Sequence, residues 1–373
     1  MFVYGQSRKK NRRNLNNINI MAFQSFKNIK ISGVAACVPE NIEENSTLSL
    51  FQSPAEYERF VATTGIERRH VVKNGFCSSD LCYEAAEKLI ETLQWSKEEI
   101  DCLIFVSQTP DYILPATACL LQHRLGLPNE CMAFDISMGC SGWVYGITVL
   151  ASLLSNGTCK KGLLLAGDTV TVTKSPRDKT TYPLFGDAGT ATAVEFQEAE
   201  KGIVSYLCTD GEGADTIMIR DGGFRHPFSE ASLSYKEYEN GSIRNNLQSY
   251  LDGTSVFTFG ISKAPKSIKK LLEYTGKSAE DIDYYIFHQA NMLMNEKIRT
   301  KLKLPMNKVP YILKDFGNTS STSIPLTLVA RLKEQLRNND LNIIACGFGV
   351  GLSWGSVLFD TKSIVCCDLI ELQ

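Results

Sequence analysis

One cysteine stands where a thiol could act as a nucleophile. Cys140 lies in the segment FDISMGCSGW, between the strand-like run FDIS and a helical pattern that begins near Ser141. The first amide groups of a helix point at whatever precedes it, and the positive end of the helix dipole would stabilise a thiolate and lower the pKa of the thiol. Most cysteines taken alone are small buried apolar residues, so a catalytic role needs support from elsewhere in the chain.

A histidine and an asparagine are the best candidates to assist this thiol. His288, in IFHQAN, is the one histidine of the four that ends a buried strand-like run. Asn318, in FGNTSS, precedes a second helical pattern. Taken singly, the histidine could be an ordinary core or surface residue, and the asparagine could cap a helix. The case for a site therefore depends on whether the fold brings the three residues together.

An internal duplication of the sequence predicts that the fold brings the three residues together. Segments of similar pattern recur in the same order in both halves of the chain, which is the signature of a repeated structural unit. The matched segments are 96–105 with 278–287, 127–140 with 304–318, 163–167 with 343–347 and 190–196 with 353–359. In a fold with a pseudo-twofold axis, equivalent strand ends meet near the axis. Cys140 and Asn318 should therefore face one another, with His288 approaching from a neighbouring strand.

Each half reads as helix, strand, strand, helix, strand and further strands. Short apolar runs such as CLIFV and GLLLA, flanked by helical patterns, are typical of strands buried on both faces of a sheet. The prediction is an α/β fold of two stacked sheets, with helices between and outside them. Residues 205–250, rich in glycine, serine and charge, are interpreted as loops that join the halves. The expected organisation is a disordered tail over 1–27, a half carrying the cysteine over 28–204, and a half carrying the histidine and asparagine over 205–373.

Composition favours an ordinary soluble protein. Of 373 residues, 43% are apolar and 21% charged, and the net charge of −2 gives no reason to expect nucleic acid as a partner. No apolar run is long enough to span a membrane, and the basic run at residues 7–13 lacks the apolar segment of a secretory signal. The twelve cysteines have no metal-ligand spacing, so reduced thiols in a cytoplasmic setting are expected.

The glycine-rich segment GFGVGLSWG (347–355) does not follow the spacing of a dinucleotide-binding loop and runs into a strand-like pattern. A loop that brings a backbone N–H against a reacting carbonyl is the better interpretation. No metal site and no cofactor are expected.

With these motifs the chain resembles the β-ketoacyl-acyl carrier protein synthase III group of the thiolase superfamily. The likeness covers roughly residues 28–362 and follows six motifs in order: TGIERRH (64–70), FDISMGCSGW, LFGDAGTATA, HQAN (288–291), GNTSS (317–321) and GFGVGLSWGS. It implies a thiolase-like duplicated fold of five layers, αβαβα, and a homodimer.

The resemblance also implies roles for individual residues. Cys140 would carry the acyl group, and His288 and Asn318 would hydrogen-bond the carbonyl of a malonyl donor as it loses CO2. The backbone N–H groups of Cys140 and Val350 would form the oxyanion hole, with Val350 in place of the expected glycine making the pocket tighter. The further assignments are an acyl pocket of Leu114, Val170 and Phe185, with Leu114 donated across the dimer interface, and CoA or carrier-protein binding by Arg59, Lys179, Phe257 and Asn291.

Some positions depart from the family pattern. Arg59 and Thr63 stand where the family has a Trp and an Arg that sandwich the adenine of CoA, and Leu293 stands where an Arg binds phosphate. The acyl donor is therefore either acyl-CoA or an acyl-carrier protein. An acidic carrier could bind a basic face, although solvated helix faces explain the same residues equally well: Lys263, Lys266, Lys269, Lys270, Lys297, Arg299 and Lys301.

The function these residues favour is decarboxylative Claisen condensation of an acyl thioester with a malonyl thioester, expected on an acyl carrier protein, through an acyl-cysteine. A hydroxymethylglutaryl-CoA synthase-like reaction is disfavoured because Thr109 stands where those enzymes carry a glutamate base. Two alternatives stay open. One is an acyltransferase that forms an ester or amide. The other is a non-catalytic acyl-binding scaffold, which the intact Cys-His-Asn set disfavours.

Overall fold

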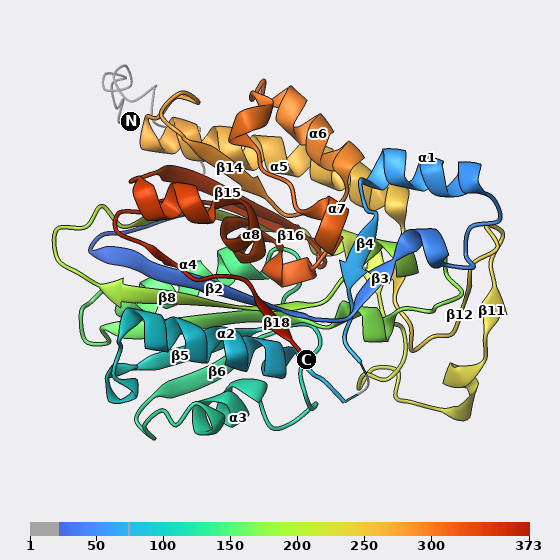
Figure 1. Cartoon of the computed structure of the whole chain (residues 1–373), viewed down its shortest axis with the longest axis horizontal. Coiled ribbons are helices and arrows are strands. Elements are labelled where there is room, and N and C mark those ends of the chain that lie inside the picture. The colour runs from blue at the N-terminus through green and yellow to red at the C-terminus, as the bar shows by residue number, and fades with distance from the viewer. Residues whose placement is uncertain (1–21, 74) are drawn as a thin grey trace, which may run out of the picture.

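Two stacked β-sheets form the frame of the computed structural model, which describes residues 22–73 and 75–373 (Figure 1). The larger sheet has the order β17-β2-β8-β7-β5-β6, with β18 also paired to β2. Its central strand β5 is apolar along its whole length and β7 is apolar between its end residues, because helices cover both faces. Its strands are β2 (Ile29–Pro39), β5 (Cys102–Val106), β6 (Met132–Ile136), β7 (Lys161–Asp168), β8 (Ala188–Phe196), β17 (Val365–Cys366) and β18 (Ile370–Leu372).

The smaller sheet has five strands in the order β1-β9-β16-β15-β14. Its strands are β1 (Phe23–Phe26), β9 (Ile203–Thr209), β14 (Tyr284–Phe287), β15 (Asn342–Gly349) and β16 (Ser353–Asp360). β14 pairs in parallel with β15 as β5 does with β7, and β16 runs antiparallel to β15 as β8 does to β7. The two sheets therefore repeat one strand pattern, as the sequence duplication predicts.

Helices complete five layers. α4 (Gly142–Leu154) and α8 (Ser323–Asn338) pack between the sheets in the largest apolar cluster, which draws on strands from both. α2 (Ser78–Leu93) and α3 (Thr117–Arg124) cover the outer face of the larger sheet, and α5 (Gly253–Thr275) and α6 (Met292–Lys301) cover the smaller one. Figure 1 shows this order from α5 and α6 at the top to α2 and α3 at the bottom. The predicted αβαβα class is confirmed.

Three two-stranded sheets and two short or peripheral α-helices make up the remaining strands and α-helices of the described residues. They are β3 (Ile42–Glu44), α1 (Pro54–Thr64), β4 (Arg68–His70), β10 (Ile217–Met218), β11 (Lys236–Glu237), β12 (Ile243–Arg244), β13 (Tyr250–Leu251) and α7 (Leu313–Phe316). In Figure 1, α1 and the β11–β12 pair lie at the right-hand end of the molecule.

The chain divides between the sheets differently from the expected halves. β1 precedes the expected first half yet pairs with β9 in the smaller sheet, and β17 and β18 return from the C-terminal end to β2 in the larger one. The expected boundary at 204/205 falls inside β9. The disordered tail predicted over 1–27 is wrong for β1, and its first 21 residues lie outside the described residues. The prediction of loops over 205–250 is wrong at its start, because β9 continues to Thr209.

The second half also lacks one expected strand. The segment that corresponds to β6 buries Val309 and Ile312 but forms no strand. Pro310, which has no N–H to donate to a strand ladder, interrupts it. None of the helices in the described part of the chain is long and apolar enough to cross a membrane.

Candidate active site

Cys140 lies at the junction between β6 and α4, two residues before the first residue of the helix. Its sulfur packs against the backbone of Gly349 at the end of β15, where a side chain would place a Cβ atom 3.0 Å from Sγ. Glycine is therefore required at position 349. This contact brings the glycine-rich loop of the second half against the thiol of the first.

Burial, not the helix, dominates the acidity of this thiol. Burial raises the pKa of Cys140 to about 11, and the negative charge of Asp168 raises it further. A hydrogen bond with Ser320, the backbone N–H of Cys140 and the positive charge of Lys174 act in the opposite direction. The lowered pKa predicted from the start of α4 is therefore not what this environment produces.

His288 follows β14 and is almost completely buried. Burial lowers the pKa of its imidazole to about 3, so the ring is neutral throughout the physiological range. Its Nδ1 lies 2.8 Å from the Ser323 hydroxyl at the start of α8. When that hydroxyl donates to Nδ1, the ring proton is on Nε2, and the imidazole acts as a neutral hydrogen-bond donor.

Asn318 is fixed by its own loop. Its Oδ1 accepts a hydrogen bond of 2.9 Å from the backbone N–H of Ser320, which leaves the two Nδ2–H groups available to a substrate oxygen. Its backbone forms a parallel bridge with Phe185: the Asn318 N–H donates to the Leu184 carbonyl, and the Asn318 carbonyl accepts from Gly186. The orientation of the amide is thus set by backbone contacts from both sides.

The segment 318–323 connects the three candidates. The Ser320 hydroxyl lies 3.9 Å from the Cys140 sulfur, its N–H holds Asn318, and the Ser323 hydroxyl lies 2.8 Å from the His288 ring. The structure therefore brings together the thiol, the imidazole and the amide that the duplication was expected to unite. The sequence reasoning missed Ser320 as a connecting residue, although it lies in the motif GNTSS.

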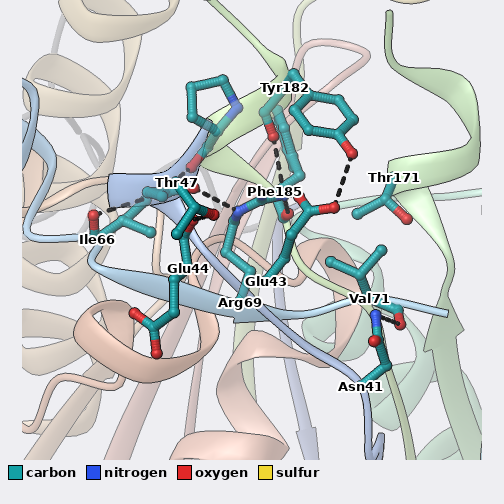
Figure 2. A network of polar contacts seen from close by, with 12 residues as sticks. Asn41, Glu43, Glu44, Thr47, Ile66, Arg69, Val71, Thr171, Tyr182 and Phe185 are labelled. Carbon is teal, nitrogen blue, oxygen red and sulfur yellow. Dashed lines mark hydrogen bonds and ion pairs between the residues drawn. The ribbon is translucent and has the colours of Figure 1, made fainter. Parts of the chain in front are cut away.

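A buried arginine supports the segment that ends at Phe185, the residue whose backbone pairs with Asn318. Figure 2 shows Arg69 with Tyr182 and Phe185. The Arg69 side chain is fully buried and donates to the carbonyl oxygens of Tyr182 at 3.1 Å and of Phe185 at 2.9 Å. It also donates to Asn45 Oδ1 at 2.9 Å and pairs with the Glu43 carboxylate. Through Phe185 this network fixes the partner of the Asn318 backbone.

A pocket of about 440 Å³ opens beside the site. Phe185, Asn291 and Asn318, all predicted site residues, line it. Asn291 also caps α6, accepting a hydrogen bond from the Met294 N–H at 2.9 Å. The pocket gives a thioester a path toward the amide of Asn318.

The other predicted residues lie apart from this pocket lining. Val170 is buried beside the loop that follows β7, while Leu114 is 77% exposed. The Val350 side chain approaches Gly139, where an added Cβ would lie 3.1 Å away. Arg59 is exposed, and Phe257 is partly buried against the cluster under α5.

Lys174 adds a buried positive charge that the sequence analysis did not identify. Its Nζ donates to the Ser249 hydroxyl at 2.5 Å and lies 4.1 Å above the centre of the Phe185 ring. Among the described residues no carboxylate lies within ion-pair distance of it, and burial lowers its pKa to about 8. An ammonium group in this position favours the thiolate of Cys140.

No group of three or more histidine, cysteine, aspartate or glutamate side chains gathers as a metal site within the described residues. The site as described consists of a thiol, a neutral imidazole and an amide.

Comparisons with known proteins show the family to which the chain belongs. Residues 134–211 match the family described as 3-oxoacyl-[acyl-carrier-protein (ACP)] synthase III, and residues 272–361 match its C-terminal family. A putative 3-oxoacyl-[acyl-carrier-protein] synthase 3 from Campylobacter jejuni is 33% identical over 91% of this chain and 96% of that protein. A beta-ketoacyl-[acyl-carrier-protein] synthase III from Streptococcus agalactiae is 34% identical over 88% of this chain and 98% of that protein.

Solved structures of the same family share the fold of this chain. A 3-oxoacyl-(acyl-carrier protein) synthase from Burkholderia xenovorans superposes with a TM-score of 0.88 at 36% identity, covering 94% of this chain and 99% of that one. The 3-oxoacyl-(acyl carrier protein) synthase III of Pseudomonas aeruginosa has a TM-score of 0.76 at 29% identity, covering 89% of this chain and 98% of that one.

Proposed function

This chain belongs to the 3-oxoacyl-[acyl-carrier-protein] synthase III family, and from that premise we propose that Cys140, His288 and Asn318 perform its reaction. The reaction is an acyl transfer that condenses an acyl thioester with a malonyl thioester and forms a 3-oxoacyl thioester. The observation that carries the assignment is the convergence of all three residues on the segment 318–323.

In the first half-reaction, the Cys140 sulfur attacks the carbonyl carbon of the acyl donor. The thioester bond of the donor breaks, and the proton of the Cys140 thiol leaves with the departing donor thiol. The backbone N–H groups of Cys140 and Val350 are the proposed donors to the tetrahedral oxyanion. Because the thiol is mostly protonated at neutral pH, the positive charge of Lys174 supports the reactive thiolate.

In the second half-reaction, the malonyl thioester loses CO2, and the electron pair of the broken bond moves into an enolate. His288 Nε2–H and Asn318 Nδ2–H are the proposed donors to the enolate oxygen. A neutral donor suits this task because it stabilises developing negative charge without giving up its proton. The enolate carbon then attacks the acyl group on Cys140, the carbon–sulfur bond to Cys140 breaks, and the thiolate recovers a proton from solvent.

We propose that the malonyl group arrives on an acyl carrier protein and that the acyl donor is an acyl-CoA or an acyl-carrier protein. Lys179, one of the proposed CoA-binding residues, is paired with Glu56 at 3.2 Å. This pair neutralises the positive charge that Lys179 would otherwise offer to the phosphates of CoA. On the proposed basic face, Lys266, Lys269 and Lys297 are exposed.

A homodimer and a cytoplasmic location are also proposed. Tyr112, Ile113 and Leu114 form an exposed apolar loop, and β6 is the edge strand of the larger sheet, with Met132 exposed at its start. An open sheet edge beside exposed apolar side chains is a surface that a second copy could cover. All twelve cysteines are unpaired, which supports a reducing compartment.

The experiment supplies the protein with malonyl-carrier protein and, in parallel, acyl-CoA or acyl-carrier donors, and follows the carrier by mass spectrometry. The expected product is the 3-oxoacyl-carrier thioester, with release of CO2. If the acyl group instead moved unchanged to an alcohol or an amine, the protein would be an acyltransferase without condensation. A chain that forms neither product nor adduct with any donor would be a scaffold, and the proposal would fail.

A further inference from the structure

A buried carboxylate with no role in the reaction above lies between the two halves of the site. Asp168 ends β7 and has no exposed surface. Its Oδ1 accepts hydrogen bonds from the Gln108 N–H at 2.8 Å and the Ser107 hydroxyl at 3.2 Å, both just after β5. Its Oδ2 accepts from the Ser321 N–H at 3.1 Å and from the Ser321 hydroxyl at 2.7 Å. Burying a charge this deeply costs free energy, so a functional role for the hydrogen bonds of Asp168 is worth testing.

The loop that Asp168 holds is the one that connects the site residues. Ser320, the residue before Ser321, holds the Asn318 amide and contacts the Cys140 sulfur. Its φ angle is 54°, in the left-handed region, where a residue with a side chain is strained. Such a conformation persists only where the surroundings hold it in place. The two hydrogen bonds from Ser321 to Asp168 hold the peptide that follows Ser320.

We propose that Asp168 is a positioning residue for the condensation step. It fastens the 318–321 loop, which belongs to the C-terminal half, to the ends of β5 and β7 in the half that carries Cys140. In this way it aims the Asn318 amide at the malonyl carbonyl. The sulfur keeps its own supports, the β6–α4 junction and Gly349. Loss of the Asp168 bonds should therefore disturb the amide more than the thiol. This inference rests on the proposed function.

Asp168 supports the position of the Asn318 amide, but its negative charge makes the Cys140 thiol less reactive. After burial, it is the largest cause that raises the pKa of Cys140. The other charged group acting on the thiol is Lys174, which lowers that pKa, and His288 is neutral. Removing the charge at 168 should therefore make the sulfur more reactive while it loosens the amide. A general loss of packing would slow both half-reactions together.

The test compares Asp168→Asn with Ser321→Ala. Asparagine keeps one acceptor oxygen but turns an NH2 group toward N–H donors, so it cannot hold both Gln108 and Ser321. In Asp168→Asn we expect Cys140 to be acylated at least as fast as in the unchanged protein, as measured by intact-mass spectrometry. Condensation should be about tenfold slower, as for loss of one buried hydrogen bond. In Ser321→Ala, where the charge remains, condensation should fall about threefold and the pH profile of thiol alkylation should not move.

The matched control is Asp101→Asn. Asp101 precedes the first residue of β5, at the end of the strand away from the site, and its carboxylate accepts hydrogen bonds from the Lys160 and Lys161 N–H groups at 2.6 Å and 3.0 Å. It is not among the charges that act on the Cys140 thiol. Its removal should leave the ratio of condensation to acylation unchanged. A ratio that fell as far as in Asp168→Asn would overturn the inference, because a carboxylate remote from the site would then give the same result.

The outcomes separate this inference from the proposed function. If the unchanged protein neither acylates Cys140 nor condenses, the proposed function fails and the inference falls with it. If the unchanged protein does both and Asp168→Asn condenses normally, or loses acylation and condensation equally, only the inference is overturned. Should Asp168→Asn fail to fold, Ser321→Ala decides: normal condensation in that variant overturns the positioning role.

Discussion

The pH dependence of Cys140 alkylation follows directly from its surroundings. Burial and the charge of Asp168 raise the pKa of the thiol from its ordinary 9.0 to about 11. Two pKa units correspond to about 2.7 kcal/mol in favour of the neutral thiol. At pH 8 only about one sulfur in a thousand is then a thiolate, and since the thiolate is the reactive form, the alkylation rate should rise tenfold for each pH unit between 7 and 10.

The assay treats the protein with a limiting amount of iodoacetamide at each pH, digests it and measures the fraction of the Cys140 peptide that is alkylated. Cys119, which is exposed, serves in the same sample as a reference for the reagent. Circular dichroism at each pH ensures that the fold persists over the range. A rate that levels off below about pH 8 would refute the reasoning. It would mean that the start of α4 outweighs burial, as the sequence alone suggested.

Three further outcomes are expected. His288→Ala and Asn318→Ala should each retain acylation of Cys140 but lose malonyl decarboxylation by about a hundredfold or more, measured as released CO2, and normal condensation in both would contradict their roles. Arg69→Met should lower the free energy of unfolding, measured by urea titration, by about 3 kcal/mol, because it leaves Glu43 and two buried carbonyls without their donor. Its control, Arg68→Met, changes a partly exposed neighbour and should lower the free energy of unfolding by less than about 1 kcal/mol. Leu114→Glu should shift the mass in light scattering from dimer to monomer, and an unchanged mass would show that this loop is not the interface.

The sequence predicted the parts of the fold that depend on local patterns. Apolar runs such as CLIFV became β5, and the duplication correctly anticipated two sheets with related strand patterns. The exchange of strands between the sheets could not be predicted in this way. β1 pairs with β9, and β17 and β18 pair with β2, across long stretches of chain, and short strands at sheet edges carry little pattern of their own.

The site shows the same division. Residue type and position after a strand selected Cys140 and His288, and the duplication added Asn318 as the counterpart of Cys140. Asp168 was not selected, because a single acidic residue at a strand end looks the same whether it meets solvent or a loop from the other half. Lys174 was missed because a lone lysine outside a strand or helix carries no sign in the sequence that it will be buried. The acidity of the thiol was misjudged because a helix start can be read in a sequence, whereas the burial that outweighs it depends on the packed structure.

The central claim is that the sulfur of Cys140 carries the acyl group in the same pocket where His288 and Asn318 act. Intact-mass measurement after incubation with an acyl thioester tests it most directly, on the unchanged protein and on Cys140→Ala. We expect one added acyl group on the unchanged protein, removed when malonyl-carrier protein is then supplied, and no adduct on the variant. An adduct that persists in Cys140→Ala, or one that malonyl-carrier protein does not discharge, would contradict the account.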